Sequence, residues 1–421
     1  MRRIFSVLFV WVFLVYVVFP AVVSGAGTSA SKESVPKEIK VGFTLAVTGP
    51  LSTDWGPPAK AFHEAYEKLV NERGGVYVKD YNAKLPLKFI IYDDGSVPDR
   101  AVELYERLAN VDKVDLFLGP GSSPITIKAS TVAEKYQIPM VTCTANSPVI
   151  YARGFKWLFG ADNVATVWAE YYYELLKHLA GKGNIPTLKT IAIIAEQNPH
   201  AMDIAWGAEN LAGKYGLEVV SVHKVPPQTT DYTAIISQLK AQKPQIIYGA
   251  GFMGTLAPFV KQAHEMGLTP FDFHVPHAGT SKEAAIRLLG PELVEGITGI
   301  CHDAPYTKGR YKLLEEVRKV SGVAPYMRTA MIIHFTAMEA LVNAIEKAGT
   351  LDRGKVMETL KDIRFDAPYG GFYLRYGIET GGKVVNGVGN FPQNIIQYQK
   401  GEIVHLWPLD YATGTYHPFR P

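Results

Sequence analysis

The regular recurrence of short apolar runs in the second half of the chain most constrains its fold. The runs begin near Thr190, Leu217, Pro244, Phe271 and Ile297, at intervals of 27, 27, 27 and 26 residues. Each run is followed by a segment with helical spacing of apolar residues, such as "DYTAIISQLKAQ" after "LEVVSVHKV". One strand, one helix and two short loops need about this length. The recurrence therefore predicts an α/β fold with a parallel sheet.

A second series of strand-like and helix-like segments precedes this one. Its four β-rich runs span residues 39–47, 87–94, 114–119 and 138–143. Helices are predicted between Tyr311 and Gly349, and the glycine-rich tail that follows is typical of short strands and hairpins. Two α/β series in one chain predict two lobes, and the segment from Asn163 to Thr166 is the first expected crossing between them.

The N-terminus has the pattern of an export signal. Arg2 and Arg3 precede the apolar run from Ile4 to Val23, and small residues follow it, so residues 1–26 are expected to direct the protein out of the cytosol. The run has 20 residues, which is long enough to span a bilayer, and an uncleaved membrane anchor is therefore the alternative. Residues 27–38 are polar and predict a tether to the folded body.

Charge and cysteine content exclude several classes of protein. Lysine and arginine outnumber the acidic residues by only 43 to 40, which argues against a nucleic-acid partner. Cys143 and Cys301 are the only cysteines, and they form neither a disulfide framework nor a C-x-x-C pair, so free buried thiols are expected. His264-Glu265 does not continue into H-E-x-x-H, and neither a metal nor a cofactor is expected.

The run Gly249 to Gly254 spells G-x-G-x-x-G, a pattern found in dinucleotide sites. Such a site also needs an acidic residue near the end of the next strand to hold the ribose. His277 follows that strand here, and Asp272 lies at its other end. We therefore interpret the glycines as a loop at the carboxyl edge of a parallel sheet, which is where ligands bind in such folds.

Loops after other predicted strands carry polar and aromatic side chains. Trp55 follows the first strand of the chain, Ser122 and Ser123 follow the third, and Thr144 and Asn146 follow the fourth. Hydroxyl and backbone donors without a cluster of arginines or lysines suit a carboxylate better than a phosphate. The alternative is structural, because Ser and Asn before a helix often serve only as N-caps and a tryptophan can lie in the core.

With these loops the chain resembles the leucine/isoleucine/valine-binding family of periplasmic binding proteins, the type I receptors of branched-chain amino-acid ABC transporters. The resemblance runs from about Ile39 to Pro408 and includes "VGFTLAVTGPLS", "DDGSVPDRAVELYERL", "FLGPGSS", "TDYTAIISQLKAQKPQIIY", "KQAHEMGL", "YGGF" and "IIQYQKGEIVHLWP". It implies a type I periplasmic-binding-protein fold, with two Rossmann-like lobes on parallel sheets joined by three hinge crossovers. The division expected from it is 39–162 plus 303–387 for lobe 1 and 163–302 plus 388–421 for lobe 2.

The resemblance also implies roles for the loop residues. Ser123 matches the serine that receives the ligand carboxylate, and Thr144 matches a position that offers backbone groups to the ligand. Asn146 stands where the family usually has Thr or Ser. Trp55 matches an aromatic residue on the first loop, and Phe252 matches an aromatic residue of the pocket.

Two positions depart from the family pattern. His200 stands where the family usually has Tyr, and His277 stands where it usually has an acid that pairs with the α-ammonium. A neutral imidazole can accept a hydrogen bond from an ammonium, whereas a protonated one repels it. The cargo is thus expected to be an amino acid or a similar carboxylate, with an aromatic or other organic acid, an amide or urea as alternatives. For His277 a plain surface-loop histidine is the alternative.

These features predict an exported receptor without catalysis that delivers its ligand to an ABC importer by closure of a cleft. The expected partners are the membrane permease subunits and, through them, cytosolic ATPases, with a possible membrane tether at residues 4–23. A sensory ectodomain is the competing binding function, although nothing resembling a signalling domain follows Pro421. An α/β hydrolase or dehydrogenase is the enzyme alternative, but a G-x-S-x-G elbow, a metal triad and the acidic ribose ligand are absent from the sequence.

Overall fold

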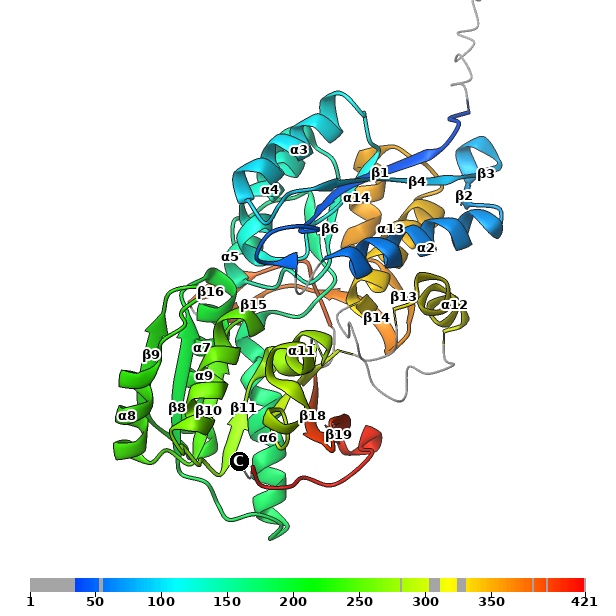
Figure 1. Ribbon diagram of the computed structural model, residues 1–421. Coiled ribbons are helices and arrows are strands. Elements are labelled where there is room, and N and C mark those ends of the chain that lie inside the picture. Colours follow the sequence, from blue (N-terminus) through cyan, green and yellow to red (C-terminus); the bar gives the residue numbers. More distant parts are fainter. Residues whose placement is uncertain are drawn as a thin grey trace, which may run out of the picture. The chain divides into compact units, whose positions relative to one another are not determined.

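The computed structural model describes residues 35–52, 56–280, 282–302, 311–323, 331–380, 382–390 and 393–419 (Figure 1). The chain divides into two units, residues 1–35 and 36–421, and both lobes belong to the second. Within the described ranges, no helix is both long and apolar enough to cross a membrane. The predicted signal or anchor segment and Trp55 lie outside these ranges.

Lobe 1 is the part of the chain built on a mixed sheet in which eight strands are described. Most of its strands pair in parallel, and the last two pairings at one edge are antiparallel. From that edge the order is β13 (Arg364–Ala367), β14 (Gly370–Arg375), β17 (Val388–Gly389), β7 (Leu158–Gly160), β6 (Met140–Thr142), β5 (Leu116–Leu118), β1 (Ile39–Leu45) and β4 (Leu87–Asp93).

Lobe 2 is built on a second sheet, with seven described strands. Five of them are parallel, and a C-terminal hairpin continues the sheet in antiparallel pairing. The order is β19 (Glu402–Trp407), β18 (Asn394–Gln399), β12 (Thr298–Cys301), β11 (Asp272–His274), β10 (Ile246–Ala250), β8 (Thr190–Glu196) and β9 (Glu218–Val225). The parallel strands begin within two residues of the predicted positions, so the recurrence in the sequence is confirmed as a strand repeat.

Helices cover both sheets, and several begin with a proline in the first turn, where its missing N–H costs no hydrogen bond. In lobe 1, α3 packs beside α4, and α13 packs beside α2 and α14 (Figure 1). The helices of lobe 1 are α2 (Pro57–Glu72), α3 (Pro98–Asn110), α4 (Ser123–Tyr136), α5 (Pro148–Tyr151), α12 (Lys312–Ser321), α13 (Met331–Ala348) and α14 (Arg353–Lys361). Those of lobe 2 are α6 (Trp168–Gly181), α7 (Pro199–Ala212), α8 (Thr233–Gln242), α9 (Met253–Glu265), α10 (Pro276–Thr280) and α11 (Lys282–Leu293).

Smaller elements complete the described part of the chain. Two hairpins lie apart from the main sheets, β2 (Val76–Val78) with β3 (Ala83–Leu85), and β15 (Ile378–Thr380) with β16 (Lys383–Val385). Single 3₁₀ turns are η1 (Lys79–Tyr81), η2 (Ala165–Val167), η3 (Gly213–Tyr215) and η5 (Leu409–Tyr411).

The chain passes between the two sheets after β7, after β12 and after β17, which makes three passages in the described residues. This order of strands confirms the predicted fold class, with parallel-sheet cores in two lobes. The exact residues at which the lobes divide stay a prediction.

Candidate ligand-binding site

The parallel strands of each sheet point their carboxyl ends at loops that carry the predicted site residues. Every one of these side chains that the structure describes is buried, with exposed fractions between 2% and 8%. They are Ser122 and Ser123 after β5, Thr144 and Asn146 after β6, His200 after β8, Phe252 after β10 and His277 after β11. The Ser–Asn loops lie in lobe 1 and the histidines and Phe252 lie in lobe 2.

In lobe 1 the hydroxyl of Ser123 joins two loops. Its oxygen accepts hydrogen bonds from the backbone N–H groups of Asn146 and Ser147, each at 3.2 Å. The Thr144 hydroxyl donates to the carbonyl of Gly121 at 2.6 Å and ties the same loops together. A serine oxygen has two acceptor sites and one hydrogen. Since both acceptor sites of Ser123 are used, its hydrogen is available for an acceptor on a ligand.

Asn146 is held by a buried carboxylate. Its side-chain nitrogen donates to Asp162 at 2.8 Å, and the other oxygen of Asp162 accepts the N–H of Asn163 at 2.7 Å. Burial raises the pKa of Asp162 to about 7, although the hydrogen bond from Asn146 acts in the opposite direction. This arrangement uses one of the two amide hydrogens of Asn146 and leaves the second for a ligand, while the amide oxygen finds no partner among the described residues.

The capping alternative for the serines is wrong. Ser122 occupies the N-cap position of α4 and Ser147 that of α5, but neither side chain makes a cap hydrogen bond. Ser147 instead donates its hydroxyl to Asp203 of α7, so this bond links a loop of lobe 1 to a helix of lobe 2.

In lobe 2 five side chains form what we call the aromatic–histidine cluster: Trp168, His200, Phe252, His277 and His302. The Nε2 atoms of His200 and His277 are 3.1 Å apart, and the ring of Phe252 lies 5.6 Å from His200 and 4.8 Å from His277. Trp168 contacts the three histidine rings, with centroid distances of 5.2, 5.7 and 5.7 Å. The surface-loop alternative for His277 is therefore wrong.

The histidines of this cluster are uncharged at neutral pH. Burial lowers the pKa of His277 to about 3 and that of His302 to about 3. Burial, together with the two neighbouring histidines, holds the pKa of His200 well below its usual value. The cluster thus neither attracts a carboxylate by charge nor repels an ammonium.

Several buried polar atoms at these loops find no hydrogen-bond partner among the described residues. They include Ser122 Oγ and Asn146 Oδ1 in lobe 1, and Trp168 Nε1 and His200 Nδ1 in lobe 2. Buried polar groups in folded proteins are nearly always paired, because an unpaired one costs the free energy of its desolvation. A group of unpaired atoms on loops at the carboxyl edges of two sheets therefore makes these loops the candidate place for a polar ligand.

The glycine-rich loop after β10 has a local explanation. A Cβ on Gly251 would lie 2.9 Å from the Cβ of Glu196, so only glycine fits there. The Glu196 carboxylate accepts the N–H of Phe252 at 2.9 Å, at the N-cap of α9. A pyrophosphate would need this donor, and a carboxylate already occupies it. This contact agrees with the interpretation of the glycine-rich run as a loop at the edge of the sheet and not as a dinucleotide site.

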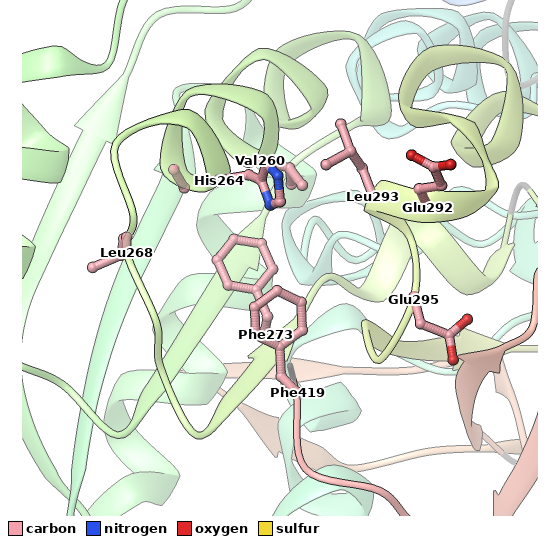
Figure 2. Close-up of a pocket in the computed structure, with 9 residues that line it drawn as sticks. Val260, His264, Leu268, Phe273, Glu292, Leu293, Glu295 and Phe419 are labelled. Atoms are coloured by element: carbon pink, nitrogen blue, oxygen red, sulfur yellow. The ribbon is translucent and has the colours of Figure 1, made fainter. Parts of the chain in front are cut away.

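The pocket in Figure 2 is a different feature of lobe 2. Its lining includes Val260 and His264 near the end of α9, Leu293 at the end of α11, and the stacked rings of Phe273 and Phe419. Helix α9 runs back from the carboxyl edge of the sheet, so its last residues lie at the opposite edge from the candidate site. The cavity volume is about 20 Å³, which suits about one water molecule.

Sequence reasoning missed three residues of this region. His302 follows β12, and the rule that identified the other loops would have found it there. Asp162 and Trp168 lie in the passage from β7 to α6, and only the path of the chain brings them to the site. Trp55, by contrast, was predicted and lies outside the described residues.

Two parallel-sheet lobes with buried polar and aromatic side chains on the loops at their carboxyl edges define the class of two-lobed α/β ligand-binding proteins. The sequence profile of the periplasmic binding protein family matches residues 38–385. The chain belongs to this family.

Known relatives agree with that assignment. The leucine-, isoleucine-, valine-, threonine- and alanine-binding protein of Pseudomonas aeruginosa is 26% identical over 345 residues, covering 81% of this chain and 87% of the relative. A leucine binding protein of Thermotoga maritima has a TM-score of 0.69 at 19% identity, covering 87% of this chain and 97% of the other. A solute binding protein of R. palustris in complex with benzoate has a TM-score of 0.68 at 17% identity, covering 90% and 98%. The two structures support the fold.

Proposed function

We propose that this protein is the receptor of an ABC importer and binds a small carboxylate-bearing molecule between the loops of lobe 1 and the aromatic–histidine cluster. The observation that carries the proposal is the set of buried, unpaired polar atoms at these loops. Ser123 and the second amide hydrogen of Asn146 would donate to the acid group, and Thr144 would contribute backbone groups, while His200, Phe252 and His277 would close over the rest of the ligand. Trp55 is proposed as a further contact.

The chemistry of lobe 1 favours a single carboxylate. Ser123 presents its hydroxyl hydrogen, and it is the first residue of α4, a helix end where partial positive charge favours an anion. None of the proposed contacts is a lysine or an arginine. Neutral donors of this kind suit the delocalised charge of a carboxylate, whereas a phosphate usually recruits a cationic side chain.

A second ligand class is supported by lobe 2. The cluster is aromatic and uncharged, and it contains no acid that could pair with an α-ammonium. An aromatic or other organic acid without an amine would bury its ring against Trp168 and Phe252 and leave no charge unpaired. Among the relatives, one name specifies several amino acids and one structure contains benzoate, so the family accommodates both classes.

The partners and the location follow from the family. We propose a membrane permease and its cytosolic ATPases as partners, an exported location, and residues 4–23 as either a cleaved signal or an anchor. A sensory ectodomain is the competing function and would show the same ligand binding without transport.

Matched pairs of ligands test the ligand class. Leucine would be compared with 4-methylpentanoate, and phenylalanine with 3-phenylpropanoate, because each pair differs only in the amine. Benzoate would be compared with benzamide, which lacks the charge. A ligand at about one hundred times its dissociation constant adds roughly 2.7 kcal/mol to the free energy of unfolding, which a thermal-shift assay detects easily.

Stabilisation by a carboxylate, with or without its amine, supports the proposal. Preference for leucine over 4-methylpentanoate identifies an amino-acid receptor, and the reverse preference identifies an organic-acid receptor. Equal stabilisation by benzoate and benzamide would contradict the carboxylate site in lobe 1. Stabilisation by NAD alone would contradict the proposed ligand class.

A further inference from the structure

Three potential metal ligands meet in the core of lobe 1, apart from the unpaired atoms of the candidate site. His63 lies on α2, Cys143 directly follows β6, and His334 lies on α13. Their ligand atoms all lie within 4.8 Å of one another, and the three side chains are at most 1% exposed. No pair of these residues is close in the sequence, so no spacing motif indicates them.

The histidine geometry is that of a metal ligand held by a second partner. His63 Nδ1 lies 2.7 Å from the carbonyl oxygen of Ala59 and must donate to it, because a carbonyl only accepts. The lone pair of His63 is therefore on Nε2, which faces His334 Nδ1 at 3.2 Å. Metal-bound histidines commonly donate their other nitrogen to a backbone carbonyl in this way, which fixes the tautomer.

The distance between the two nitrogens also fits a shared ion. An ion about 2.0 Å from each nitrogen, at a tetrahedral angle, would place the nitrogens about 3.3 Å apart. A simple hydrogen bond between the rings would give a similar distance, and this is the alternative that an experiment must exclude.

We propose that His63, Cys143 and His334 together bind one Cu(I) ion. A soft thiolate with two imidazoles is a donor set that copper prefers, and three ligands satisfy Cu(I). One thiolate neutralises a monovalent ion, so the bound site carries no net charge into the core. Zn(II) would keep one positive charge there and usually takes a fourth ligand.

The surroundings exclude water from this site. The ring of Phe43 lies 4.8 Å from that of His63, and the ring of Phe89 lies 6.3 Å from it. An apolar shell of this kind protects Cu(I) from oxidation by limiting solvent access. On binding, the Cys143 thiol gives its proton to solvent and the sulfur takes the ion, so copper keeps its oxidation state.

The site would also stiffen lobe 1. Cys143 precedes Thr144 in the chain, so a bound ion would join α2 and α13 to the start of the loop that carries Thr144 and Asn146. Metal binding of this kind adds to the stability of the folded state.

The test uses the full-length chain in mild detergent under anaerobic conditions, with Cu(I) delivered from a competing chelator. The variants are Cys143→Ser and, as a matched control, Cys301→Ser, which removes the other buried thiol, in lobe 2. We expect one Cu(I) per chain in the wild type and in Cys301→Ser, and affinity weakened by about a hundredfold or more in Cys143→Ser.

X-ray absorption on the loaded wild type gives an answer that does not depend on any variant folding. One sulfur at about 2.3 Å and two nitrogens at about 2.0 Å from the ion would support the site. A folded wild-type protein that takes up no Cu(I), an ion without a sulfur neighbour, or unchanged uptake by folded Cys143→Ser would overturn it. Uptake of Zn(II) in preference to Cu(I) would overturn the assignment to copper.

Discussion

At the scale of single residues, Ser123 has two functions. Its hydroxyl oxygen holds two loops of lobe 1 together, and its hydroxyl hydrogen remains to donate to a ligand. Ser123→Ala removes both functions. A hydrogen bond to a charged group contributes about 1.5–3 kcal/mol, so we expect the dissociation constant for a carboxylate ligand to rise about 10- to 100-fold. Isothermal titration calorimetry measures this change directly.

Ser130→Ala is the matched control for that variant. Ser130 lies about two turns further along α4, is buried, and donates to the carbonyl of Thr126 at 2.6 Å. Its loss should lower stability without changing ligand affinity. Equal losses of affinity in the two variants would mean that Ser123 acts only through the fold.

His274 gives a prediction about pH. It stacks on Tyr172 with ring centroids 3.9 Å apart and lies 3.0 Å from the Thr298 hydroxyl, outside the aromatic–histidine cluster. Burial lowers the pKa of His274 from 6.5 to about 3, so the unfolded chain binds the extra proton more readily than the folded one. The stability due to neutral His274 is complete above pH 6.5 and is lost as the pH falls towards 3.

The variant His274→Phe keeps a ring on Tyr172 and removes the titration. Between pH 7.5 and 4.5, wild type should lose about 2–3 kcal/mol more unfolding free energy than the variant, as measured in urea. The pKa of neighbouring Asp272 is raised to about 6 by burial, which has the opposite effect on stability, but Asp272 is present in both proteins and its effect cancels. A difference that does not vary with pH would show that His274 binds its proton as readily in the folded chain as in the unfolded one, which would contradict the lowered pKa.

At the scale of elements, two glycines near the start of α9 have different roles. Gly251 avoids a steric clash, whereas Gly254 lies in open space. An alanine Cβ at position 251 would lie 2.9 Å from Glu196 Cβ and 3.1 Å from its carboxylate, the group that accepts the Phe252 N–H. Gly251→Ala should therefore cost about 1–3 kcal/mol of stability. Gly254 lies inside α9, and beyond its own helix backbone and chain neighbours no atom would lie within 4 Å of such a Cβ, so Gly254→Ala should add about 0.4–1 kcal/mol.

Chemical unfolding of both variants measures the two effects. If both variants raised or both lowered the free energy of unfolding, the steric clash expected between an alanine at position 251 and Glu196 would be contradicted.

The strands and long helices of both lobes could be predicted because their apolar runs are long or strictly spaced. The hairpin of β2 and β3 and the strand β7 were not predicted. Each of these strands has only three residues, which is too short for its apolar residues to show a period that distinguishes a strand from a loop. Several strands are also shorter than the apolar runs that predicted them, such as β5. A run also includes buried residues beyond the last hydrogen bond between neighbouring strands.

At the scale of the whole molecule, the site could be predicted only as far as the edge rule of parallel sheets reaches. That rule brought Ser122, Thr144, Phe252 and the histidines after β8 and β11 to two sets of facing loops. It could not place Trp168, whose position depends on how the chain passes from one sheet to the other. The trio of His63, Cys143 and His334 depends wholly on tertiary packing, since its members come from three distant elements.

The hydrogen bonds that Ser123 makes within lobe 1 also have a consequence for the rates at which a ligand binds and leaves. Its partners, the N–H groups of Asn146 and Ser147, belong to the same lobe, so the half of the site that we propose to bind the acid needs no contact with lobe 2 to assemble. We expect a ligand to dock first on this prepared half, at a rate that changes little when His200 or His277 is replaced. Lobe 2 then governs how long the ligand stays, because the complex must open there before release. In such a receptor, substitutions in lobe 2 can change which ligands dissociate slowly without changing how fast ligands associate.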